Sequence, residues 1–259
     1  MKICVLMKQV PDKNTPLKIA EDHCSLEKNH VTWVSNESDN YALEEALLMK
    51  ESHGGEVVVC TLGGESASQV LKDAMAKGAD RSIFLSDSKF DLLDILSLAK
   101  VFAAALKDEK IDLTLSGLQS DDLGNSQMGL LLAELLNMSH ASLVMGTEVQ
   151  NDHSIKVKRE LEGGWFQWTK LSLPASISIQ SGINIPRYAT LKGIMMVKNK
   201  TTNQLSGQDV GVEGESPMVR LEKLYIPEKS KETTFIEGSA DEIAGKLVDV
   251  FKNEMKVVN

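Results

Sequence analysis

Residues 56–85 read "EVVVCTLGGESASQVLKDAMAKGADRSIFL", and this stretch decides the fold. Residues 56–64 are an apolar, β-branched run closed by two glycines, which is typical of a buried strand. Apolar residues then recur at helical spacing over 67–77 and stop at Gly78, and residues 81–85 form a second apolar run. A strand, a helix and a strand with short connections predict two parallel strands with the helix packed on their sheet.

The same alternation continues on both sides of this unit. An apolar run at 3–10 predicts a first strand, and the weak alternation over 17–34 predicts a hairpin. Further elements are a helix from Asn40 to His53, a helix over 92–107, a strand over 111–117 and a helix over 130–136. Four alternations of strand and helix predict an α/β fold: a doubly wound, mostly parallel sheet with helices on both faces.

The pattern changes after about residue 141. Four successive β-segments, with turns at Asn151-Asp152 and Gly163-Gly164, predict an added antiparallel β-layer. From about residue 201 the chain is polar and Gly-rich, and residues 239–255 predict an amphipathic C-terminal helix with an apolar face. That helix either folds back on its own domain or docks on a partner subunit, and the pattern alone favours neither.

Composition excludes several classes of protein. The 28 Lys and Arg against 37 Asp and Glu give a net charge of -9, which argues against a general nucleic-acid binder. No apolar run is long enough for a membrane span, and the start "MKICVLMKQV" lacks the cleavage pattern of a secretory signal. Cys4, Cys24 and Cys60 are widely spaced without a CxxC pair, so we expect free thiols in the cytoplasm and no metal site.

Three loops leave the ends of predicted strands, where open α/β sheets bind ligands. They are residues 10–12, 62–64 and 116–129, and the last reads "SGLQSDDLGNSQMG". It runs directly into a helix, whose first-turn N–H groups and dipole suit an anion. A capped loop without any ligand explains the same residues. The chain has no GxGxxG, Walker or SGGxDS-type loop, no GxSxG elbow and no paired metal-binding histidines, so no catalytic apparatus is visible.

One long stretch carries a family resemblance. Residues 157–195 read "VKRELEGGWFQWTKLSLPASISIQSGINIPRYATLKGIM" and resemble the signature region of the β subunit of electron transfer flavoprotein. The shared features are V-x-R-E-[IL]-[DE]-G-G, then L-P-A, then P-R-Y-A-T-L. The stretches "NESDNYALEEALLMKE" (36–51) and "AMAKGADRSI" (74–83) also match, and the tail is similar to that of some bacterial members.

The resemblance implies a Rossmann-like domain and an electron carrier rather than an enzyme. Such a β subunit pairs with an α subunit that holds most of the FAD, and it buries an AMP of its own. The heterodimer takes electrons from flavin dehydrogenases, such as those for acyl-CoA or amines, and passes them to an ETF:quinone oxidoreductase. The implied location is the bacterial cytoplasm, and neither nucleic acid nor a membrane is an expected partner.

The resemblance also assigns residues by position. The AMP site is expected at Leu6, Asn36, Asp39, Leu62, Asp122, Gly124, Asn125, Ser126, Gln127, Met128 and Gly129. Arg159 and Glu160 are expected near the FAD between the subunits, although such a pair is more often a cross-strand ion pair. The nearby Trp165 and Trp168 would usually be packing residues.

The loop "NIPRYATLKGIMMVKNK" (184–200) is expected to dock the dehydrogenase. Pro186 sets an extended entry, Leu191 is the anchor, and a short helix begins at residues 194–197. An apolar anchor within a polar rim is how small interfaces gain most of their binding energy. The docking residues are Arg187, Tyr188, Leu191, Ile194 and Met195, with Arg187, Lys192 and Lys198 as the rim.

The chain departs from the family at two positions of the AMP site. Many members have Ala where Leu6 stands and Thr where Met128 stands. Bifurcating members hold a second FAD in place of AMP and carry a D-G-D-T-A-Q-like loop, whereas this loop reads "DDLGNSQ", which favours AMP. The alternatives are that bifurcating type, an ATP-using adenylate-forming enzyme, and a nucleotide-binding stress or regulatory module.

The predicted division of the chain follows from these assignments. Residues 1–183 form the AMP-binding α/β domain, 184–200 the partner-recognition loop with its short helix, and 201–259 an extended arm that contacts the α subunit.

Overall fold

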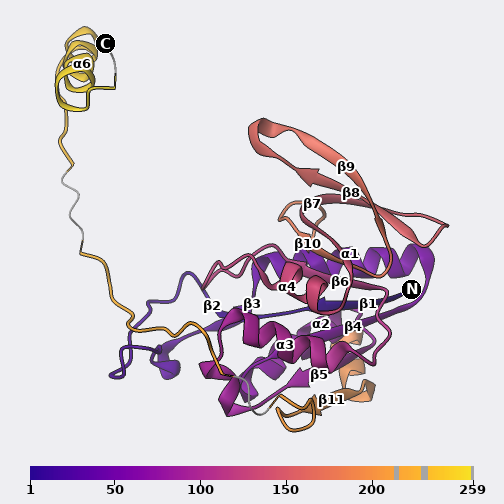
Figure 1. The fold of residues 1–259 in the computed structure, drawn as a ribbon. Coiled ribbons are helices and arrows are strands. Elements are labelled where there is room, and N and C mark those ends of the chain that lie inside the picture. The colour runs from indigo at the N-terminus through magenta and orange to yellow at the C-terminus, as the bar shows by residue number, and fades with distance from the viewer. Residues whose placement is uncertain (213–215, 229–232, 258–259) are drawn as a thin grey trace. The chain divides into compact units, whose positions relative to one another are not determined.

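The computed structural model describes residues 1–212, 216–228 and 233–257, and the chain divides into the units Met1–Lys223 and Leu224–Asn259. Within the described residues, the first unit holds one nine-stranded sheet in the order β11-β5-β4-β1-β6-β10-β7-β8-β9 (Figure 1). Its strands are β1 (Lys2–Leu6), β4 (Glu56–Leu62), β5 (Arg81–Leu85), β6 (Leu113–Gly117), β7 (Ser139–Val149), β8 (Ser154–Glu160), β9 (Phe166–Ser172), β10 (Ala175–Ile179) and β11 (Thr202–Leu205).

Pairing is parallel from β11 through to β7 and antiparallel at the β7–β8–β9 edge. The predicted α/β fold with a mostly parallel sheet and added antiparallel strands is therefore confirmed. The added strands extend the same sheet, because β10 returns to pair with both β6 and β7.

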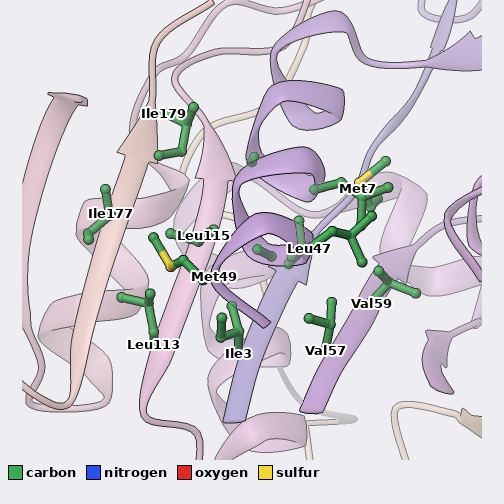
Figure 2. Close-up of a cluster of buried hydrophobic side chains, with 14 of the residues drawn as sticks. Ile3, Met7, Leu47, Met49, Val57, Val59, Leu113, Leu115, Ile177 and Ile179 are labelled. Atoms are coloured by element: carbon green, nitrogen blue, oxygen red, sulfur yellow. The ribbon is translucent and has the colours of Figure 1, made fainter. Parts of the chain in front are cut away.

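Helices cover both faces of the sheet (Figure 1). Helices α1 (Glu37–His53) and α2 (Ser68–Lys77) share a core with one face of the sheet, and Figure 2 shows Leu47 of α1 above Ile3, Val57 and Leu113. Helices α3 (Ile95–Leu106) and α4 (Met128–Leu135) cover the other face. Each large apolar side chain buried in this way contributes about 1.5–3 kcal/mol to folding.

The three cysteines are free in the structure. Cys4 and Cys60 lie in the core between the sheet and helices α3 and α4. Burial raises the pKa of Cys4 to about 12 and raises the pKa of Cys60. Both thiols are therefore protonated and unreactive at neutral pH.

Two predictions about the first 35 residues are wrong. The apolar run 3–10 is not one strand: β1 ends at Leu6, and β2 (Gln9–Pro11) pairs antiparallel with β3 (Trp33–Ser35) in a small second sheet. The start of α1 causes this break, because the Lys8 N–H donates to the Asp39 carboxylate at 2.8 Å and the Lys8 carbonyl accepts from Asn36 at 2.9 Å. In place of the predicted hairpin at 17–34, Ile19 and Leu26 form an isolated antiparallel bridge with backbone hydrogen bonds from Ala20 to Ser25 and from Glu27 to Lys18, and residues 33 and 34 pair with β2.

Other element boundaries also differ from the sequence prediction. Helix α4 begins at Met128, two residues early, and α5 (Leu191–Met196) begins three residues before the predicted start. Residues 202–205 form β11 on the edge of the sheet, so the stretch predicted as an arm from residue 201 starts inside the first unit.

The second unit contains α6 (Ala240–Asp249), which continues as a π-helix over Val250–Glu254. The helix begins with a capping box in which Ser239 and Glu242 satisfy each other's backbone N–H groups. Leu247 and Phe251, predicted on its apolar face, are exposed. A role for this helix in contacting a partner subunit stays a prediction. Among the described residues, no helix is long and apolar enough to cross a membrane.

Candidate functional site

The strand order locates the candidate site. From β1 the chain proceeds to β4 and β5 on one side of the sheet, and it then returns to place β6 on the other side of β1. Ligands of doubly wound sheets bind at the carboxyl ends of the strands that flank such a reversal. Leu6 and Gly117 end β1 and β6, and Leu62 ends the neighbouring β4. The predicted loops 62–64 and 116–129 therefore lead away from the same edge of the sheet, whereas residues 10 and 11 of the first predicted loop belong to β2 in the small sheet.

Asn36, directly before α1, holds the loop after β6 in place. Its side chain is buried, accepts a hydrogen bond from the Asp121 N–H at 2.9 Å, and donates to the Gln119 carbonyl at 3.0 Å. Ser38 donates to the same carbonyl at 2.7 Å. The predicted site residue Asn36 therefore binds protein backbone through both ends of its amide.

Asp39 joins the two strands at the reversal. One carboxylate oxygen accepts from the Lys8 N–H and the other from the Gly117 N–H, each at 2.8 Å. Burial raises its pKa to about 6, although these hydrogen bonds act in the opposite direction. Gly117 has to be glycine here, because a Cβ would lie 2.2 Å from the Ser38 hydroxyl.

The two acidic residues of the loop have partners within the protein. Lys8 Nζ lies 2.7 Å from the Asp122 carboxylate, and Asp121 accepts from the Glu37 N–H at the start of α1 at 3.2 Å. Burial raises the pKa of Asp122, but the hydrogen bonds from Lys8 and Ser120 outweigh it and leave that pKa lowered. These contacts reduce the repulsion that the two carboxylates would exert on a nearby anion.

The loop then enters α4 without a side-chain cap. Gly124 and Ser126 adopt the left-handed region, with φ of 62° and 54°, and the residues from Leu123 to Gln127 are exposed. The N-cap residue Gln127 makes no side-chain capping hydrogen bond, and in the described part of the chain the N–H groups of Met128 and Gly129 have no hydrogen-bond acceptor. This helix end offers donors to an anion.

Gly129 brings α4 close to the sheet. The Ser176 hydroxyl donates to its carbonyl at 2.8 Å, and a Cβ on Gly129 would lie 2.5 Å from the Ser178 Oγ and 2.9 Å from the Ser116 Oγ. The absence of a side chain lets the first turn rest on these hydroxyls. It is the same packing role that a glycine serves where helix and strand meet in dinucleotide-binding folds.

The structure thus brings most of the predicted nucleotide residues to one edge of the sheet. The side chain of Leu6 points into the core beneath helices α3 and α4, and Leu62 packs at its margin. Lys8, Ser176 and Ser178 lie outside the loops predicted from the sequence, whereas Ser116 and Gln119 lie within the predicted loop 116–129 without having been named as site residues. Lys8 follows a strand and its charge was visible, but its partner lies 114 residues away.

Arg159 and Glu160, predicted near the flavin, lie at the end of β8. Arg159 donates to the Ser142 carbonyl at 3.1 Å, and Glu160 accepts from the Gln180 side chain at 3.1 Å. The interpretation of Trp165 and Trp168 as packing residues is wrong, since both are exposed, Trp165 by 74%. Exposed aromatic side chains in a cluster mark interaction surfaces.

The loop at 184–200 presents apolar side chains to solvent. Tyr188 is 93% exposed and Leu191 76%, and Ile194 and Met195 are also exposed. Leu191 is the first residue of α5. The N-terminus of this helix is capped by the Thr190 hydroxyl, which accepts from the Gly193 N–H at 3.0 Å. Arg187 differs from its predicted place in the rim: it folds onto α1, where it pairs with Glu44 and Glu51.

Over the residues that the structure describes, no cluster of three His, Cys, Asp or Glu side chains is arranged to hold a metal ion.

The sequence profile of the electron transfer flavoprotein domain matches residues 24–209. Electron transfer flavoprotein subunit beta of Methylophilus methylotrophus is 34% identical over 99% of both chains, and that of Bacillus subtilis is 32% identical over 100% of both. The caffeyl-CoA reductase-Etf complex subunit CarD of Acetobacterium woodii is 31% identical over 98% of this chain and 99% of its own.

Proposed function

The chain belongs to the electron transfer flavoprotein β-subunit family, and on that premise we propose that it binds AMP and docks flavin dehydrogenases within a heterodimer. The α subunit of that heterodimer holds most of the FAD. The FAD supplies the redox chemistry, and this chain provides binding, orientation and a docking surface. Within this proposal the chain is an electron carrier that delivers electrons to a quinone oxidoreductase.

The observation that carries the AMP proposal is the uncapped start of α4 at the strand reversal. A monophosphate fits there, because the N–H groups of Met128 and Gly129 are available and the residues from Gly124 to Gln127 can surround it. A main-chain site also accommodates Met128, because backbone donors do not require a hydroxyl at that position. Asn36 and Asp39 support the site from behind by holding the loop and the strand ends.

The edge of the sheet at β8 and β9 suits contact with the α subunit and its flavin. Leu161, Trp165, Phe166 and Trp168 are exposed there, beside Arg159 and Glu160. Lys158 lies over the Phe166 ring at 4.1 Å from its centroid, which adds a cation to this apolar surface. Aromatic residues with a few charges are the composition that interface cores favour. Residues 239–255, with their exposed apolar side chains, are the second proposed contact.

The loop at 184–200 is the proposed dehydrogenase-docking surface. An electron carrier has to bind and leave quickly, which suits a small interface with one anchor side chain rather than a large apolar one. Leu191 at the tip of α5, with Tyr188, Ile194 and Met195 around it, has that form.

Co-expression with an α-type subunit tests the proposal. We expect a yellow heterodimer with one FAD per complex, and perchloric acid extraction should release one AMP as well. A second FAD in place of AMP would support the bifurcating alternative. A colourless monomer that hydrolyses ATP would refute the proposal in favour of an adenylate-forming enzyme.

A further inference from the structure

The docking loop is held to the domain at both of its ends. We propose that Glu44 of α1 is a positioning residue that fixes the approach of the loop, so that Leu191 is presented in one orientation. The inference rests on the proposed docking function of this loop. It assigns to a buried carboxylate, 143 residues away from Arg187, control of how a partner protein is bound.

The first end of the loop is clamped through Arg187. Its backbone N–H donates to the Glu44 carboxylate at 3.0 Å, and its guanidinium Nε and Nη2 donate to the same group at 2.9 and 2.8 Å. Glu51, about two turns further along α1, accepts from the guanidinium at 2.5 Å. A two-pronged bond of a guanidinium to a carboxylate sets orientation as well as distance. Main chain and side chain of Arg187 are therefore held by one group.

Glu44 cannot act by touching a partner protein. Its side chain is only 6% exposed, whereas that of Arg187 is 31% exposed. A carboxylate buried to this extent is strongly unfavourable without its counter-ion, so the chain at Arg187 has one preferred position. Only three residues separate Arg187 from Leu191, and the last of them caps α5. The position of Arg187 therefore limits where the anchor leucine lies.

The second end of the loop is clamped on α2. Lys200 Nζ donates to the carbonyls of Met75 and Ala79 at 2.8 and 2.5 Å, at the C-terminus of that helix. Burial lowers the pKa of Lys200. Gly193 lies against the same helix end, where a Cβ would be 2.1 Å from the Ala76 carbonyl oxygen. Helix α5 thus packs against the C-terminal end of α2 while its apolar side chains remain exposed.

Clamping an exposed apolar loop at both ends reduces the entropy that docking has to remove. Ordering of loops and side chains on binding costs affinity, and preorganisation avoids that cost. A purely structural ion pair would change stability alone. A positioning role predicts a change in docking and in local order while the rest of the domain stays intact.

The test uses the heterodimer with its α subunit and four variants: Glu44→Gln, Leu191→Ala, their double variant, and Glu37→Gln. Glu37 lies on the same helix and pairs with Lys13 at the surface, so its variant makes the matched chemical change away from the loop. The electron donor is whichever acyl-CoA or amine dehydrogenase reduces the wild-type heterodimer. The readouts are kcat and KM for the heterodimer as acceptor, flavin content, and hydrogen exchange of residues 186–196.

We expect Glu44→Gln to raise KM about tenfold, equivalent to about 1.4 kcal/mol, with kcat and flavin content unchanged. Exchange of residues 186–196 should become faster in Glu44→Gln and stay as in wild type in Glu37→Gln. The double variant should be close to Leu191→Ala alone, because Glu44 acts only through the presentation of that leucine.

Each of the following results would overturn the inference. If Leu191→Ala raises KM and Glu44→Gln does not, the positioning role is wrong while the docking function stands. If the double variant shows the product of both effects, Glu44 acts independently of Leu191. If neither single variant changes KM, the proposed docking function itself is wrong. If Glu44→Gln loses flavin or unfolds, Arg187→Lys is tested in its place. This variant keeps the positive charge and loses the two-pronged hydrogen bonding to the Glu44 carboxylate. An unchanged KM in Arg187→Lys would refute the positioning role.

Discussion

The buried carboxylate of Asp39 leads to a measurable prediction about pH. In Asp39→Asn the side chain keeps one oxygen, so one of the two N–H groups, of Lys8 or of Gly117, loses its acceptor. That loss costs about 1–3 kcal/mol at every pH. The substitution removes a negative charge, in contrast, only at pH values at which the wild-type Asp39 carboxyl is ionised. The variant is therefore expected to change how stability depends on pH as well as stability itself.

The sign follows from the direction of the pKa shift. Burial raises the pKa of Asp39 from 3.8 to about 6, so between these values the folded chain binds more protons than the unfolded chain. The stabilising contribution of the neutral carboxyl group is present at low pH and is lost as the pH rises through 6. With these two pKa values, linkage gives a loss of about 1 kcal/mol in the free energy of unfolding between pH 5 and pH 7.

The assay is urea unfolding of the full chain at pH 5 and pH 7, followed by tryptophan fluorescence, for the wild type and for Asp39→Asn. Other titrating groups are common to both proteins and cancel in the comparison. The unfolding free energy of the wild type should fall more than that of the variant between pH 5 and pH 7, by the amount given above. Asp122→Asn is the control without an effect in this range: hydrogen bonds lower the pKa of Asp122 from 3.8, so this carboxyl is ionised in the folded and unfolded chain at both pH values, and its removal should leave the pH dependence as in the wild type. Equal pH dependence of wild type and Asp39→Asn would refute the reasoning.

Three further substitutions test the packing around the sites. Gly129→Ala should lower the free energy of unfolding by about 1–3 kcal/mol, since its Cβ would lie 2.5 Å from the Ser178 hydroxyl, and Ser178→Ala in the same chain should restore part of the loss in urea unfolding. Gly193→Ala should displace α5 from the end of α2, because its Cβ would lie 2.1 Å from the Ala76 carbonyl oxygen. We expect faster hydrogen exchange of α5 and weaker dehydrogenase docking, with the flavin content unchanged. Asp94→Asn should speed exchange of residues 216–219, because the Asp94 carboxylate accepts from the N–H groups of 218 and 219, and the effect should be constant from pH 5 to 8, since hydrogen bonds lower the pKa of Asp94 to about 2.

The sheet and its helices were predictable from local patterns. The run Val57-Val58-Val59 is fully buried because β4 has a helix layer on both sides, and a strand in that position is apolar throughout. Helix α2 ends where Gly78 takes a φ of 140°, which a residue with a side chain rarely adopts. Where burial alone sets which residues are apolar and how they are spaced, the local sequence is sufficient to predict the element.

Features that depend on distant residues were not predictable in the same way. Strand β11 reads Thr-Asn-Gln-Leu and has no apolar alternation, and it is a strand only because it pairs with β5 some 120 residues earlier. The end of β1 at Leu6 follows from a hydrogen bond to Asp39, which no pattern within residues 3–10 contains. The composition of residues 116–129 indicated an anion site, but it did not reveal that Asn36 and Asp39 bind backbone groups.

Arg187 shows most clearly what a residue type leaves open. A cation beside an exposed leucine in the sequence is reasonably interpreted as part of a polar rim that meets a partner. In the structure its charge is used internally, because Glu44, nearly buried on another helix, needs a counter-ion. The exposed surface at the tip of the loop is therefore more apolar than the sequence suggests, with Lys192 and Lys198 left as its predicted charged rim. An anchor of that kind owes its specificity to its position, and the ion pair that holds it in position lies outside the contact surface.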